Sequence, residues 1–144
     1  MDKRNDTRMA GNGGPRRRSV LIADDTPATR DALKSLFEQE GYEVSTAADG
    51  TEALDMLGTL SPAPQLVIAD LNMPTMDGFA FRTEQMKRKN MAHLPVIALT
   101  GNQGLRQHAL RVGFTAALQK PCDPSMLLSL VAHHCDRGGT TRPR

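Results

Sequence analysis

The stretch QLVIAD, at residues 65–70, sets a run of apolar residues directly before an aspartate, and it predicts a strand that ends at Ala69. A short continuous apolar run of this kind is typical of a strand that is covered on both faces. Two similar runs are SVLIA (residues 19–23) and PVIAL (residues 95–99), and two weaker ones are EVSTA (43–47) and AALQ (116–119). The five runs together predict a five-stranded sheet.

Helix-like segments separate the predicted strands, and one more follows the last strand. Thr26 and Pro27 indicate the start of the first helix and Gly41 its end. Asp49 and Glu52, three residues apart, resemble a capping box at the start of the second helix. The other helices are predicted at residues 79–89, at residues 102–112 and from Pro124 onward, the last with an apolar face of Met126, Leu127, Leu130 and Val131.

Strands that alternate with helices predict an α/β fold, in which helices cover both faces of a five-stranded parallel sheet. In open, doubly wound sheets of this type, ligands bind at the carboxyl ends of the strands. The polar side chains that follow the apolar runs are therefore the candidate functional residues.

Polar residues stand where four of the apolar runs stop: Asp24 and Asp25, then Asp70, Thr100 and Lys120. Each alone has an ordinary structural explanation, because aspartates favour turns, threonines cap helices and lysines occupy the surface. Parallel strands bring their carboxyl ends to the same edge of a sheet, so we expect these side chains to meet there. Their joint occurrence in this order favours a functional site over five independent turn and surface residues.

The charges at this edge favour one chemistry. Three crowded carboxylates repel one another, and a single lysine leaves the group negative, so a divalent cation is expected to complete the neutralisation. Oxygen ligands select Mg²⁺, or Mn²⁺, over zinc. A carboxylate beside such a metal, a lysine and a hydroxyl can act as a nucleophile that accepts a phosphoryl group.

Over residues 19–135 the chain resembles the receiver domain of bacterial two-component response regulators. The matching stretches are VLIADDTPATR, EGYEVSTAADGTEAL, VIADLNMPTMDGF, PVIALTG and LQKP. The resemblance implies a flavodoxin-like fold with strand order 2-1-3-4-5. It also implies that the domain is phosphorylated on an aspartate in the presence of Mg²⁺.

Position by position, the resemblance implies roles for the acidic residues and their neighbours. Asp70 matches the phosphorylated aspartate, which also contacts the metal. Asp25 is similar to a direct metal ligand, Asp24 to a ligand that acts largely through water, and Asn72 to the residue whose main-chain carbonyl binds the metal. Lys120 matches the lysine that pairs with the phosphoryl group.

The chain departs from the family pattern near the end of the fifth strand. Thr100 matches the switch hydroxyl of the family, but Ala117 stands where receivers usually carry Tyr or Phe. Since Ala117 has no ring to move inward, we expect phosphorylation to change the surface around residue 117 less than in the family scheme. Phe114 lies nearby and is predicted to pack in the core under the fourth helix.

The resulting hypothesis is a stand-alone response regulator that signals through protein–protein contacts. It would take phosphate from a sensor histidine kinase or a histidine phosphotransfer protein, and it would be no enzyme beyond slow self-dephosphorylation. An aspartate-based, Mg²⁺-dependent phosphatase is the alternative, although that class uses a second acid at the position of Asn72, where an amide cannot transfer protons. A binding module that works without phosphorylation is a third possibility, which the intact acidic cluster disfavours.

Composition sets the remaining boundaries. The chain has 144 residues and no Trp, a length suited to one domain, and its two Cys lack the spacing of a metal site. Residues 1–18 hold six Lys/Arg and two Asp, and the segment is expected to be a disordered basic tail, like residues 136–144. The domain proper is then 19–135.

No apolar run reaches the length of a membrane span, and the N-terminus lacks the apolar core of a secretory signal. These features predict a cytoplasmic protein without membrane contact. Nothing after Cys135 has the composition of a DNA-binding unit, so no direct DNA binding is expected.

Overall fold

Five parallel strands form a single sheet in the order β2-β1-β3-β4-β5, which confirms the predicted fold. The computed structural model describes residues 18–140, so the predicted N-terminal tail lies almost wholly outside the described residues, as do residues 141–144 of the C-terminal one. The strands are β1 (Ser19–Ala23), β2 (Glu43–Ala47), β3 (Leu66–Asp70), β4 (Val96–Thr100) and β5 (Ala116–Gln119).

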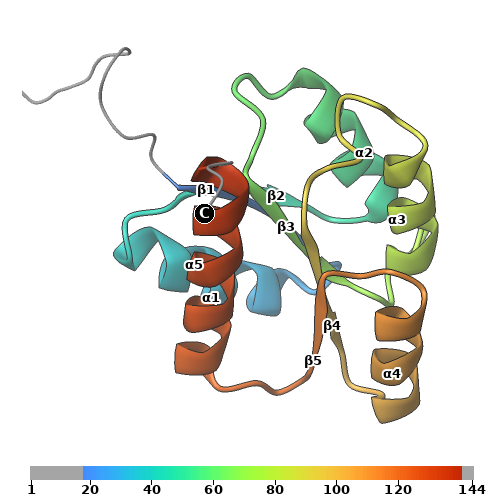
Figure 1. Ribbon diagram of the computed structural model, residues 1–144. Helices are drawn as coiled ribbons and strands as arrows, with labels where there is room; N and C mark the ends of the chain where they lie inside the picture. Colours follow the sequence, from blue (N-terminus) through green and yellow to red (C-terminus); the bar gives the residue numbers. More distant parts are fainter. Residues whose placement is uncertain (1–17, 141–144) are drawn as a thin grey trace, which may run out of the picture.

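Each strand is followed by a helix, and Figure 1 shows α1 and α5 on one side of the sheet with α3 and α4 on the other. Gly41 and Gly113, which follow α1 and α4, have positive φ angles of 90° and 107°, as expected of glycines that end helices. Among the described helices, none is both long and apolar enough to cross a membrane. The helices are α1 (Pro27–Gln39), α2 (Gly50–Thr59), α3 (Gly78–Met86), α4 (Gln103–Arg111) and α5 (Pro124–Thr140).

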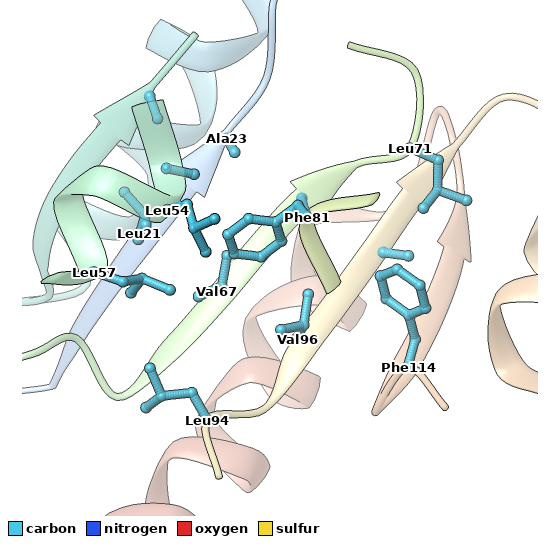
Figure 2. Close-up of a cluster of buried hydrophobic side chains, with 14 of the residues drawn as sticks. Leu21, Ala23, Leu54, Leu57, Val67, Leu71, Phe81, Leu94, Val96 and Phe114 are labelled. Atoms are coloured by element: carbon cyan, nitrogen blue, oxygen red, sulfur yellow. The ribbon is translucent and has the colours of Figure 1, made fainter. Parts of the chain in front are cut away.

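The sheet has a hydrophobic cluster on each face, because successive strand residues point to opposite sides. Leu21 and Val67 lie in the cluster under α2, α3 and α4, whereas their neighbours Ile22 and Ile68 lie in the cluster under α1 and α5. Figure 2 shows the first cluster, in which Phe81 of α3 points toward the side chains that rise from the sheet. Burial on both faces explains why these strands read as continuous apolar runs.

Several boundaries differ from the sequence prediction. Strands β3 and β4 each begin and end one residue later than predicted, so that Asp70 and Thr100 are their last residues. Helix α3 ends at Met86 and not at residue 89. Helix α5 runs to Thr140, beyond the expected domain boundary at residue 135.

The predicted apolar face of α5 was wrong in one position. Leu127, Val131 and Cys135 are buried at four-residue spacing, whereas Met126 is 56% exposed. Adjacent residues of an α-helix are about 100° apart around its axis. Met126 therefore lies beside the buried stripe and not within it. Phe114 is buried in the cluster under α4, as predicted.

The capping box at the start of α2 is present with one change. The Asp49 carboxylate accepts a hydrogen bond from the Glu52 N–H at 2.8 Å. Glu52 in return accepts one from the N–H of Ala48 at 2.6 Å, and not from that of Asp49 itself. The two bonds fix the point at which the chain leaves β2 and enters α2.

We expect Phe37→Ala to destabilise the protein by about 3–5 kcal/mol, because its side chain is fully buried and its loss leaves a cavity. Met126→Ala is the matched control, since removal of an exposed apolar side chain changes stability by about 0.5 kcal/mol or less. Urea denaturation measures both changes. Similar losses in the two variants would contradict the described burial.

Candidate functional site

The predicted polar residues come together at the carboxyl edge of the sheet. Asp24 follows β1 and Asp70 ends the neighbouring strand β3. Carboxylate oxygens of Asp24, Asp25 and Asp70 all lie within 4.8 Å of one another. Asp24 and Asp70 are buried and Asp25 is exposed, so the cluster opens to solvent on one side.

Lys120 joins two of these carboxylates. Its Nζ lies 3.1 Å from Asp24 Oδ2 and 3.0 Å from Asp70 Oδ2. The side chains of Asp24 and Asp70 are 1% and 8% exposed, so their charges are largely removed from water. A buried carboxylate of this kind needs a counter-charge at hydrogen-bond distance, and the single ammonium group provides it for both.

Backbone N–H groups orient the other oxygens of the same carboxylates. Asp24 Oδ1 accepts a hydrogen bond from the N–H of Thr26 at 2.9 Å, and Asp70 Oδ1 accepts one from the N–H of Asn72 at 3.0 Å. Both are bonds from an aspartate to the chain two residues on, which is a common local turn. Each aspartate is thereby held between its own turn and Lys120.

Thr100 lies at the end of β4, next to the end of β3. Its side chain is fully buried, and its hydroxyl oxygen accepts a hydrogen bond from the N–H of Asn102 at 3.1 Å. A hydroxyl that accepts in this way can still donate to a phosphoryl oxygen. The N–H of Lys120 donates to the Thr100 carbonyl at 2.7 Å, which keeps the two residues side by side.

Two arginines that bond to the main chain at the end of β1 and within β5 were missed by the sequence analysis. The Arg30 guanidinium donates to the main-chain carbonyl of Asp24 at 2.8 Å, and Arg106 Nε donates to the carbonyl of Ala117 at 3.0 Å. Each arginine stands four residues after the residue that precedes its helix, Thr26 or Asn102. An arginine repeated at this position of two helices that follow site strands was the available signal.

The donor set fits a hard divalent cation. The three carboxylates of the cluster offer oxygen atoms, and such atoms are the preferred ligands of Mg²⁺. Lys120 carries one positive charge against the three negative ones. A cation at the open, Asp25 side would neutralise the remainder.

Comparison with known proteins relates this chain to a family of signalling domains. A family model for the response regulator receiver domain matches residues 20–132. The chain is 41% identical over 118 residues to an uncharacterized 14.6 kDa protein of Leptolyngbya boryana, covering 81% of this chain and 88% of that one. It is 38% identical over 116 residues to response regulator Rre1 of Synechocystis, covering 78% of this chain but 49% of that protein.

Among solved structures, the chain resembles the signal receiver domain of a signal transduction histidine kinase from Syntrophus aciditrophicus. The TM-score is 0.77 and the sequence identity 29%, with 88% of this chain and 95% of the other covered. That solved structure is described as the receiver domain of a histidine kinase.

The charge environment of Lys120 has a consequence for stability. Burial acts to lower the pKa of Lys120, but the hydrogen bonds that its ammonium group donates to Asp70 and Asp24, together with their negative charges, outweigh it, so the pKa is raised above its ordinary value. A lysine with a raised pKa in the folded state stabilises the fold fully below its unfolded pKa. That stabilisation is lost as the pH rises through the folded pKa.

We expect Lys120→Met to destabilise the metal-free protein at neutral pH by about 1–3 kcal/mol, because Asp24 and Asp70 lose their partner. The difference from the wild type should shrink as the pH rises through the raised pKa of Lys120, where the wild-type lysine loses its proton. Urea denaturation from pH 8 to about 12 measures it. The exposed Lys34→Met is the control, and a difference for Lys120→Met that stays constant over this range would contradict the ion pairs.

Proposed function

The chain belongs to the response regulator receiver family, and on that basis we propose that it accepts a phosphoryl group on Asp70. The donor is a phosphohistidine of a sensor histidine kinase or of a histidine phosphotransfer protein. The observation that carries the proposal is the pairing of Lys120 with both Asp24 and Asp70, since it puts a cation at the oxygen that would receive the phosphoryl group.

Mg²⁺ is the proposed cofactor, with Mn²⁺ as a substitute. Asp24, Asp25 and Asp70 would hold it through carboxylate oxygens and Asn72 through its main-chain carbonyl. When bound, the ion supplies positive charge that lets an anionic phosphoryl donor approach an anionic site.

The residues of the chain then have distinct roles in the transfer. A carboxylate oxygen of Asp70 attacks phosphorus while the bond from phosphorus to the donor histidine breaks. Lys120 stays paired with the transferred group and offsets the charge on its oxygens. The Thr100 hydroxyl donates a hydrogen bond to one of those oxygens, and its movement is how the site reports phosphorylation to the rest of the domain.

The proposed output is a change of surface that a downstream protein recognises, in the cytoplasm and without direct contact with DNA. The relatives include a protein that this chain covers for most of its length, the Leptolyngbya protein, and a longer one, Rre1, of which it covers about half. The first of these favours a stand-alone role. The protein is not proposed to hydrolyse small phosphate esters steadily, because Asn72 carries an amide at the position where an aspartate-based phosphatase needs an acid.

Asp70→Asn should abolish acid-stable phosphoryl incorporation from acetyl phosphate in the presence of Mg²⁺, because an amide oxygen is a poor nucleophile for this reaction. Wild-type labelling should in turn require Mg²⁺. Intact-mass spectrometry measures the incorporation. Asp31→Asn, which changes an exposed aspartate of α1, is the matched control and should be labelled like the wild type. Undiminished labelling of Asp70→Asn would rule out Asp70 as the acceptor.

Asp25→Ala should weaken Mg²⁺ binding by more than about 10-fold, because even the loss of an outer partner of a metal ligand costs about that much and Asp25 is proposed to bind the metal itself. The change removes a carboxylate oxygen from the open side of the cluster. NMR titration or calorimetry suits the measurement, because the chain has no Trp. Equal Mg²⁺ affinity in Asp25→Ala and in the control Asp31→Ala would remove Asp25 from the ligand set.

A further inference from the structure

The loop that follows Asp70 contains a strained turn. Thr75 has a φ angle of 67°, which is unfavourable for a residue branched at Cβ. Around it, the N–H of Met76 donates to the carbonyl of Pro74 at 2.6 Å, and this closes a three-residue γ-turn. A γ-turn with positive φ is rare and strained, and such a conformation persists only where surrounding contacts enforce it.

The contact that holds this turn comes from α2. The N–H of Gly50, the first residue of α2, donates to the carbonyl of Met76 at 3.0 Å. The first N–H groups of a helix have no partner within the helix, so this donor is free to bind the loop. The Met76 side chain packs against the core cluster on the same side. Together the two contacts fasten the residue next to the strained one.

Only a residue without a side chain fits at position 50. A Cβ there would overlap the Met76 carbonyl oxygen and approach Met76 Cγ to 2.9 Å. The first of these is a backbone atom, so the loop itself would have to move. By contrast, a Cβ added to Gly58, near the other end of α2, would meet nothing within 4 Å. The glycine at 50 therefore serves the close approach of the loop.

The far end of the loop is fixed in the same way. The N–H of Gly78 donates to the Leu71 carbonyl at 3.1 Å, and a Cβ at Gly78 would come within 2.7 Å of the Asp70 carbonyl. Between the two anchors lies Asn72, whose N–H orients the Asp70 carboxylate. A shift of the loop at Met76 is thus transmitted along a short, doubly fastened segment to Asp70.

We propose that Gly50 is a positioning residue of the acceptor site: its N–H and its lack of a side chain hold loop 71–77 in the strained form that directs Asp70 and Asn72 toward the metal. The proposal rests on the proposed function, because it concerns the same site. It assigns to the start of α2 a part in phosphoryl acceptance, although α2 contributes no group that contacts the transferred phosphoryl.

The test compares Gly50→Ala with Gly58→Ala in the whole chain. Mg²⁺ affinity, and beryllofluoride affinity in the presence of Mg²⁺, are measured by NMR, and stability by urea denaturation. Gly50→Ala should lower the Mg²⁺ affinity about 10-fold, as loss of an outer partner of a metal ligand does. Gly58→Ala should bind like the wild type. A Gly50→Ala protein that is folded and binds Mg²⁺ and beryllofluoride as tightly as Gly58→Ala overturns the proposal.

A measurement on the wild type keeps the proposal testable if Gly50→Ala does not fold. Coupling between sites is reciprocal, so if the anchor supports ligand binding, binding must support the anchor. Hydrogen exchange of the Gly50 amide should therefore slow when Mg²⁺ and beryllofluoride are added, and unchanged exchange contradicts the proposal. If the wild type binds neither ligand, the proposed function itself fails. If it binds both ligands while the exchange of the Gly50 amide is unchanged, only the role of Gly50 fails.

Discussion

The ion pairs of Lys120 with Asp24 and Asp70 are the interaction on which the arrangement of the site depends. One ammonium group joins the ends of β1, β3 and β5. In the sheet, β3 is the central strand, β1 is its neighbour, and β5 is an edge strand. Both carboxylates are nearly buried, and burying like charges together is costly without a counter-charge. The hydrophobic clusters on the two faces fix the strand register, and the register keeps these three groups within reach of one another.

The sheet positions some residues of the site, and a strained loop positions the others. The strand ends place Asp70, Thr100 and Lys120 on backbone that is paired on both sides or hydrogen-bonded to a neighbour, so their positions are set by the fold. Asn72 lies instead in a loop whose γ-turn must be enforced from outside. Strain of this kind is typical of functional sites, where surrounding contacts hold the backbone in an unfavourable conformation.

The sequence predicted the fold well because buried parallel strands are apolar on both faces and end abruptly. The same property made Asp70, Thr100 and Lys120 recognisable as candidate site residues, since a polar residue after an apolar run stands out in the sequence. The partners of long side chains were harder to predict: Arg106 occupies a position that repeats that of Arg30, but its bond to the Ala117 carbonyl joins α4 to β5, and the sequence does not indicate that partner. Met126 was misplaced for a related reason, because an apolar residue beside a helix stripe looks like part of it.

The most direct test of the account is a crystal structure of the protein with Mg²⁺ and beryllofluoride, a mimic of the phosphoryl group. The account predicts beryllium bonded to an Asp70 carboxylate oxygen, with Lys120 Nζ and the Thr100 hydroxyl on its fluorines. It further predicts the metal among the oxygens of Asp24, Asp25, Asp70 and the Asn72 carbonyl. Beryllofluoride bound to another residue, or a metal that none of these aspartates contacts, would contradict it.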